Sequence, residues 1–294
     1  MTDFCKSPLN YIGGKYSLLN EIISKFPKEI DTFIDLFAGG LNVAVNTNAK
    51  QILANDKNTY LVDMFFYLKS SSTKEVIEEV RKTIIKYSLS KENADGYIQL
   101  RQDYNRTHSP LLLFVLTCYS FNHQIRFNNN FCFNTPFGKS RSSYNKNIEN
   151  NLSKFCKLLK EKDIKLSSYD FRDYPFSKVR NGVTVVYCDP PYLITTGSYN
   201  DGKRGFGDWT NKEDKELFDI LDFLNQQGII FFLSNVLCHK GKKNHELMEW
   251  SRKYNVYHLN KSYSNCNYHL KNKSELSDEV LITNYGKEQE EISY

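Results

Sequence analysis

The chain has 294 residues, enough for one large domain or two modest ones around a full hydrophobic core. Its composition, 40% hydrophobic and 25% charged, is that of a globular protein, and its net charge of +5 permits a polyanionic partner without requiring one. The longest apolar stretches, 111–118 and 229–233, are too short to span a bilayer, and no apolar leader follows Met1. We therefore expect a cytoplasmic protein with no membrane partner.

The cysteine and histidine pattern argues against a disulfide framework or a metal site. Seven cysteines are scattered along the chain without a C-x-x-C pair, which indicates free thiols in a reducing compartment. Cys238 and His239 are adjacent but lack partners at the spacing of zinc ligands, so no metal is expected.

The first 60 residues contain two patterns typical of ligand binding. In the segment Tyr11-Ile12-Gly13-Gly14-Lys15 the glycines permit close backbone approach to a ligand and Lys15 adds a cation, although alone the pattern also suits a plain turn. A helix is expected over 18–26, and then a buried strand over 32–37 that leads through Ala38-Gly39-Gly40 into a helix starting near 41. This strand, glycine turn and helix form the first unit of a doubly wound sheet.

A second strand, 51–55, ends at Asp56, 21 residues after Asp35. That is the distance at which doubly wound folds place a carboxylate to accept hydrogen bonds from ribose hydroxyls, although Asp56 alone could equally be a strand end or a helix cap. The glycine turn is not G-x-G-x-x-G, so the pattern favours an adenosine-bearing cofactor without a pyrophosphate.

The pattern becomes helical from 61 to 163. Thr73 is expected to cap an amphipathic helix, and further helices are predicted over 97–106 and 110–119. Between Thr107 and Asn147 there is no Asp or Glu, while bases, aromatics and amides alternate. Such a segment suits a nucleic-acid surface, where cations meet phosphates and aromatics stack, although a solvated basic loop has the same composition.

The sheet then resumes, with strands expected over 164–169, 183–188, 228–233 and 280–284 and a helix over 212–226. The 228–233 strand is expected to end at Ser234-Asn235. The stretch 193–209 contains four glycines and is predicted to close over a substrate, and the tail from Gly286 is predicted to be disordered.

The strand over 183–188 leads into Asp189-Pro190-Pro191-Tyr192, which is the most informative motif of the chain. The prolines supply no backbone donor and must end the strand, so Asp189 lies at the carboxyl edge of the sheet, where ligands bind in open α/β folds. A carboxylate, prolyl carbonyls and an aromatic ring suit a planar heterocycle that bears an amino group.

Together these motifs resemble the Dam-like, D12-class adenine-N6 methyltransferases of DNA. N-Y-I-G-G-K, F-I-D-L-F-A-G-G, the N-H-Q-I-R-F-N and F-N-T-P-F-G block, and Y-C-D-P-P-Y occur in the family's order over nearly the whole chain. The resemblance implies a Rossmann-like, doubly wound methyltransferase sheet formed by 1–60 and 164–294, with 61–163 as an inserted helical DNA-recognition domain. It also implies S-adenosylmethionine as methyl donor and base flipping in double-stranded DNA, with a cognate restriction endonuclease as a further partner and a monomer or weak dimer as the functional form.

The resemblance also implies roles for individual residues. Those expected to bind the cofactor are Tyr11, Gly13, Lys15, Asp35, Phe37, Ala38, Gly39, Gly40, Asp56, Asp170, Phe171 and Asp189. The catalytic motif is Asp189, Pro190, Pro191 and Tyr192. The DNA contacts are Phe121, Asn122, Arg126, Asn134, Pro136, Lys139 and Arg141. Phe121 replaces the family's usual Tyr and Lys139 a frequent Arg, so a base preference does not transfer.

Other functions compete with this one. Cytosine-N4 methylation uses a similar exocyclic amine, but that family usually has Ser before Pro-Pro-Tyr. Methylation of RNA or of a protein amide is disfavoured by the basic, aromatic insertion. A catalytically silent DNA-binding protein is disfavoured by the intact Asp189 and Tyr192, and a nicotinamide oxidoreductase by the absent dinucleotide glycine pattern.

Overall fold

The computed structural model describes residues 4–11, 13–176, 182–195, 209–259 and 277–286. The four glycines predicted to belong to a closing segment, most of the basic segment after His258, and the tail from 287 lie outside these residues.

A mostly parallel β-sheet forms the centre of the molecule. Its strands are β1 (Thr32–Asp35), β2 (Gln51–Asn55), β3 (Ile164–Ser167), β4 (Thr184–Cys188), β5 (Ile230–His239), β6 (Lys242–Lys243), β7 (Asn255–His258) and β8 (Asp278–Thr283). They lie in the order β3-β2-β1-β4-β5-β8-β7, with β6 paired to β5. The first five are parallel, and β8 is antiparallel to both of its neighbours. The predicted α/β architecture with a doubly wound sheet is confirmed at this level.

The strand order reverses between β1 and β4. From β1 the chain proceeds outward to β2 and β3, and then returns to place β4 on the other side of β1. Ligands of open α/β sheets bind at such a switch point, outside the carboxyl ends of the strands. The ends of β1 and β4 are followed by Leu36 and Asp189, and Leu36 N donates a hydrogen bond to Tyr187 O at 2.9 Å.

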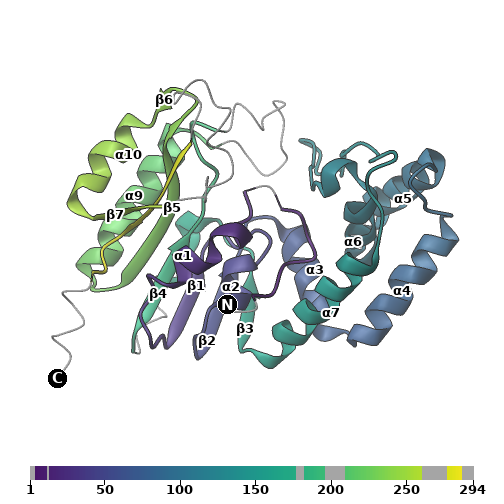
Figure 1. Cartoon of the computed structure of the whole chain (residues 1–294), viewed down its shortest axis with the longest axis horizontal. Helices are drawn as coiled ribbons and strands as arrows, with labels where there is room; N and C mark the ends of the chain where they lie inside the picture. The colour runs from purple at the N-terminus through teal and green to yellow at the C-terminus, as the bar shows by residue number, and fades with distance from the viewer. Residues whose placement is uncertain (1–3, 12, 177–181, 196–208, 260–276, 287–294) are drawn as a thin grey trace, which may run out of the picture.

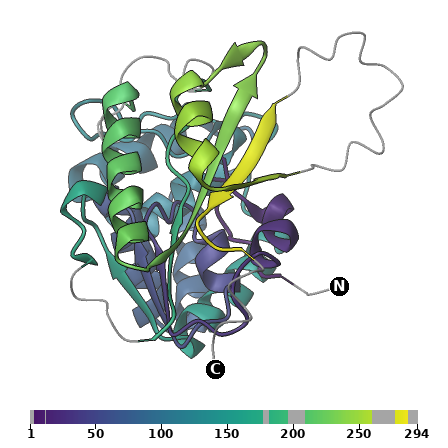
Figure 2. The same cartoon turned by 90° about the vertical axis from the view of Figure 1, so that its left-hand side faces the viewer.

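Helices cover both faces of the sheet. They are α1 (Leu19–Ile23), α2 (Asn42–Asn46), α3 (Thr59–Ser70), α4 (Thr73–Lys86), α5 (Ala94–Thr107), α6 (Pro110–Tyr119), α7 (Lys146–Glu161), α9 (Asn211–Gln226) and α10 (His245–Trp250). One face is covered by α9 and α10, shown in green in Figure 2, through apolar side chains such as Leu217, Leu221 and Leu247. The other face carries α1, α2 and α3, and Figure 1 shows α4 to α7 gathered beyond β3 and α3.

The helices between β2 and β3 share one hydrophobic core with the sheet. Phe33 and Val185 of the sheet belong to the same buried cluster as Tyr97 and Phe114 of α5 and α6. The predicted amphipathic helix is α4, but its cap is Ser72 rather than Thr73, so it begins one residue earlier than predicted. Ser72 and Glu75 form a reciprocal capping box, which satisfies two of the unpaired backbone groups at the helix start.

The strand β5 is longer than the sequence indicates. It was predicted to end at Ser234-Asn235, yet it continues to His239 because it pairs with β8 as far as Cys238. Ser234 is fully buried, and its hydroxyl is hydrogen-bonded to that of Tyr187 at 2.8 Å. A satisfied polar side chain does not interrupt a buried strand. The short α10 and the edge strand β7 were not predicted.

Six cysteines lie in the described part of the chain, and all six are free thiols, as predicted. In that same part, no helix is long and apolar enough to cross a membrane.

Candidate active site

Acidic residues follow four adjacent parallel strands at their carboxyl ends. Asp35 ends β1, Asp56 directly follows β2, Asp170 follows β3 and Asp189 directly follows β4. Because parallel strands present their carboxyl ends at one edge of the sheet, all four acids lie along that edge. Sequence reasoning had assigned each of them to the site.

The glycine turn after β1 is held between Asp56 and Tyr11. Gly39 has φ +47°, and its backbone N–H donates to Asp56 Oδ2 at 2.9 Å. A Cβ at Gly39 would lie 3.0 Å from the ring of Tyr11, and one at Gly40 would lie 3.2 Å from Tyr11 Cβ. The structure therefore brings the Tyr11 segment onto the glycine turn, as expected for two parts of one binding site.

Asn55, which the sequence did not single out, ties three loops of this edge together. Its Nδ2 donates to Leu36 O at 3.1 Å and to Tyr169 O at 3.0 Å, and its Oδ1 accepts from Tyr169 N and from the Ser167 hydroxyl. A buried amide at the end of β2 thus fixes the loops that follow β1 and β3.

Asp35 is a buried carboxyl group with an unused oxygen. It is 1% exposed, and among the described residues its Oδ1 has no hydrogen-bond partner. Burial raises the pKa of Asp35 well above its usual value, and the nearby carboxylates of Asp189 and Asp56 raise it further. Such a group favours a cationic ligand.

Asp189 lies against two donors, one from the N-terminal segment and one from its own motif. Lys15 Nζ is 2.8 Å from Asp189 Oδ1, and the Tyr192 hydroxyl donates to the same oxygen at 2.9 Å. Burial raises the pKa of Asp189, while the adjacent Lys15 ammonium acts in the opposite direction. The Asp189 side chain retains 18% exposure and so is not sealed inside the core. Pro190 is buried and Pro191 is exposed.

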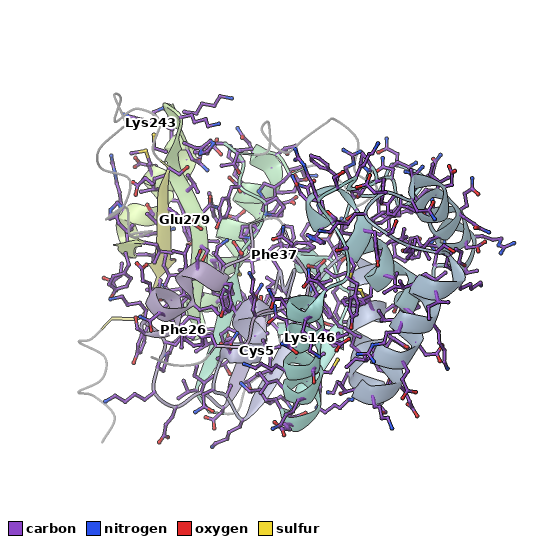
Figure 3. All side chains as sticks on the ribbon, turned by 45° about the vertical axis from the view of Figure 1, so that its right-hand side comes forward. Cys5, Phe26, Phe37, Lys146, Lys243 and Glu279 are labelled. Carbon is purple, nitrogen blue, oxygen red and sulfur yellow. The ribbon has the colours of Figure 1, made fainter. Side chains whose placement is uncertain are left out.

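Glu279 on β8 completes this group and was missed by sequence reasoning. Its Oε1 is 3.6 Å from Lys15 Nζ and accepts from the Tyr192 hydroxyl at 3.3 Å. Figure 3 labels Glu279 in its place on β8. No motif marks Glu279, because only the antiparallel insertion of β8 beside β5 brings it toward Asp189.

An aromatic group stands beside the acids. Phe37 and Phe171 have ring centroids 5.5 Å apart, and Trp209 lies 5.6 Å from Phe37 and 5.4 Å from Phe171. The Trp209 indole N–H donates at 2.6 Å to the buried Asp214, which fixes the ring. Neither Trp209 nor Asp214 was predicted as a site residue; Trp209 is recognisable in the sequence only as an aromatic preceding the capped helix α9.

Asp170 lies beside the aromatic group but is engaged in ion pairs. Lys57 Nζ and Arg172 Nε are each 2.7 Å from its carboxylate oxygens. The Arg172 guanidinium and the Lys57 ammonium hold the pKa of Asp170 well below its usual value.

The predicted DNA-contacting residues lie in the loops between α6 and α7. Arg126 Nε donates to Asn134 Oδ1 at 3.0 Å, and Phe121 N donates to Pro136 O at 2.8 Å. The Arg141 guanidinium lies 5.6 Å from the ring centre of the exposed Phe121. The structure thus pairs these residues, while Lys139 is an exposed residue of the same loop.

A direct contact joins this loop to the cofactor segment. Asn10 Nδ2, next to Tyr11, donates to Asn122 O at 2.9 Å. Asn122 has φ +52°, a left-handed conformation that asparagine tolerates better than most residues. The first motif and the loop are therefore adjacent, although 112 residues separate them in the sequence.

A doubly wound sheet with acids, a glycine turn and an aromatic group at its switch point defines an α/β protein whose ligand site lies at the carboxyl edge of the strands. The chain belongs to the D12 class N6 adenine-specific DNA methyltransferase family, whose sequence model matches residues 11–265.

Individual relatives agree with this assignment. The type II methyltransferase M.FokI of Planomicrobium okeanokoites is 51% identical over 282 residues, which cover 96% of this chain and 43% of the relative. The modification methylase StsI of Streptococcus sanguinis is 47% identical over 284 residues, which cover 96% of this chain and 43% of the relative. The DNA adenine methylase of Escherichia coli strain K12 is 27% identical over 232 residues, which cover 77% of this chain and 79% of the relative. The chain thus spans less than half the length of the two more similar relatives.

Proposed function

We propose that the chain transfers a methyl group from S-adenosylmethionine to the N6 amino group of an adenine flipped out of duplex DNA, at a specific sequence. The observation that carries the proposal is the position of Asp189-Pro190-Pro191-Tyr192 at the switch point of the sheet, on the same edge as the Gly39 turn. Family membership supports the choice of adenine over cytosine.

The residues of the edge fit an adenosine-bearing sulfonium cofactor. Asp35 Oδ1, buried without a partner among the described residues, suits the cationic end of the ligand. Asp56 Oδ1 and Oδ2 each accept one backbone hydrogen bond, from Asn58 N and Gly39 N, and each carboxylate oxygen can accept a further one from a ribose hydroxyl. Phe37, Phe171 and Trp209 would offer the adenine ring an apolar, aromatic surface to pack against.

S-adenosylmethionine supplies the electrophilic methyl group on its sulfonium. The amino nitrogen of adenine is a poor nucleophile because its lone pair is delocalised into the ring. Asp189 and the Pro190 carbonyl accept from the two amino N–H bonds and so favour a pyramidal nitrogen with a free lone pair. Holding the amine toward the bound cofactor would supply much of the rate. As the nitrogen–carbon bond forms and the carbon–sulfur bond breaks, the negative charge at Asp189 would stabilise the amine, which becomes cationic and then loses one proton to water.

The loop between α6 and α7 is proposed to hold the duplex. Phe121 and Asn122 would occupy the space that the flipped base leaves, which offsets part of an unstacking cost of a few kcal/mol. Arg126 and Asn134 would contact base edges, and Lys139 and Arg141 would contact phosphates. The relative StsI is named a modification methylase, so we further propose that the chain acts in a restriction-modification system together with a cognate endonuclease.

The substitution Asp189→Ala tests the proposal. We expect it to abolish methyl transfer, with at least a thousandfold lower kcat, while the dissociation constant for S-adenosylmethionine changes by less than about fivefold. Transfer is measured with labelled cofactor on duplex DNA, and nucleoside analysis of the digested product identifies the methylated base. Turnover retained by the variant would contradict the role of Asp189. N4-methylcytosine in the product would show that the target base is cytosine and not adenine.

A further inference from the structure

Glu279 is a second carboxylate directed at the same ammonium and the same hydroxyl as Asp189. Lys15 Nζ lies 2.8 Å from Asp189 Oδ1 and 3.6 Å from Glu279 Oε1. The Tyr192 hydroxyl lies 2.9 Å from the first oxygen and 3.3 Å from the second. Lys15 and Tyr192 thus each contact both acids, and Lys15 is only 4% exposed.

The lysine is held firmly in this position. Its ammonium also donates to Gly13 O at 2.7 Å and lies 4.9 Å from the centre of the Tyr192 ring. Lys15 therefore cannot leave Asp189 without breaking three contacts that its own segment and the catalytic motif provide. A positive charge of this kind stabilises the ligand-free site.

The same positive charge opposes the proposed reaction. Methyl transfer makes the target amine cationic, and a carboxylate neutralised by an adjacent ammonium stabilises a new cation poorly. Lys15 and Asp189 alone carry a net charge of zero. With Glu279, whose side chain is only 14% exposed, the three groups carry a net charge of −1 in a site where water screens charges weakly.

We propose that Glu279 is a positioning residue for methyl transfer, which holds Lys15 and Tyr192 on Asp189 and keeps the group of charges net negative toward the reacting amine. This inference rests on the proposed function. The proposed site then includes, besides the motifs at the ends of β1 and β4, a residue of β8. This strand lies two positions away from β4 in the sheet.

The test compares Glu279→Gln, which keeps the shape and removes the charge, with Glu279→Asp, which keeps the charge on a shorter side chain. We expect Glu279→Gln to lower kcat about tenfold or more, while KM for DNA and the dissociation constant for S-adenosylmethionine stay within about twofold of wild type. Glu279→Asp should recover most of the lost kcat. Glu249→Gln serves as the matched control. Glu249 lies in α10, is 72% exposed and forms an ion pair with Arg252 in the turn that follows the helix.

Three results would overturn the inference: an unchanged kcat in Glu279→Gln, an equal loss in both variants, or a loss of cofactor affinity as large as the loss of kcat. The last result would make Glu279 a structural residue. Should Glu279→Gln unfold, a folded but inactive Glu279→Asp would also contradict the proposal. Wild-type protein that transfers no methyl group would refute the proposed function itself, whereas an active wild type with an unaffected Glu279→Gln would refute only the role of Glu279.

Discussion

At the scale of single residues, the site concentrates negative charge where water is scarce. Asp35 has a raised pKa because it is buried and lies near the charges of Asp189 and Asp56. Asp189 has a raised pKa chiefly because it is buried, while Lys15 acts in the opposite direction. Burial raises the pKa of Asp56, and the hydrogen bonds that it accepts from the N–H groups of Asn58 and Gly39 act to lower it. Ionised carboxylates in such surroundings destabilise the fold unless a ligand compensates them.

We expect Asp35→Asn to stabilise the ligand-free protein. The pKa of Asp35 is raised in the folded state, so its contribution to stability is fully present below the unfolded value of 3.8 and is lost as the pH rises through the folded pKa. The advantage of the variant in the free energy of unfolding should therefore grow steadily with pH. Urea unfolding of both proteins from pH 4 to pH 8 measures this difference, and a constant difference would contradict it.

The same variant should bind S-adenosylmethionine more weakly, because it lacks the negative charge next to the cationic end of the ligand. A variant that is more stable but binds the ligand more weakly identifies an acid that serves ligand binding rather than the stability of the fold. Isothermal titration calorimetry at neutral pH measures the affinity; equal affinities would exclude contact between Asp35 and the ligand.

Asp56→Ala should weaken cofactor binding about tenfold, since the variant loses both the ribose contact and the acceptor that holds Gly39 N. Methyl transfer at saturating cofactor should be affected less than binding. An unchanged dissociation constant would remove Asp56 from the ribose site.

At the scale of elements, strands position the acids, while loops carry the residues that we propose contact the DNA. The loops between α6 and α7 are fixed by bonds such as those from Arg126 to Asn134 and from Tyr97, whose hydroxyl donates to Thr135 O at 2.8 Å. Recognition residues on loops held by a helical scaffold are typical of binding sites.

We expect Arg126→Ala to lower DNA affinity or relax sequence preference by a factor of about 10 to 100, the value of one good base contact. Asn134→Ala should produce the same phenotype more weakly, because it releases the Arg126 side chain. Binding to cognate and non-cognate duplexes is compared, with the exposed Arg252→Ala as control. If Arg126→Ala binds both duplexes as wild type does, Arg126 is only a surface charge.

At the scale of the whole molecule, the sheet, the covering helices and the net charge act together. The net charge is +5, and the absence of Asp and Glu between Thr107 and Asn147 concentrates positive charge in the region that contains the recognition loops. Because cations that bind phosphates release counterions from the DNA, the logarithm of the association constant for DNA should fall linearly with the logarithm of the salt concentration.

Lys139→Ala should reduce the slope of that dependence by about one, since it removes one phosphate contact, and should weaken binding equally for all sequences. Fluorescence anisotropy at 50 to 200 mM salt measures the slope. A wild-type slope in Lys139→Ala would show that Lys139 does not contact the DNA backbone.

The sequence alone determined the strands of the parallel sheet, the helices with clear periodicity, and the acids at the strand ends. It did so because buried β-branched runs, glycine turns and Pro-Pro breaks are local patterns, and parallel strands necessarily align their carboxyl ends. The four motifs by themselves indicate the family.

Only the tertiary structure decided which residues from distant segments complete the site. Glu279 reaches Lys15 and Tyr192 because β8 inserts antiparallel beside β5, and Trp209 joins Phe37 and Phe171 because Asp214 fixes its indole. The extension of β5 past Ser234 likewise depends on a hydroxyl partner from β4. These contacts depend on which strands become neighbours and which polar groups find partners, and neither is encoded in the local pattern of a single segment.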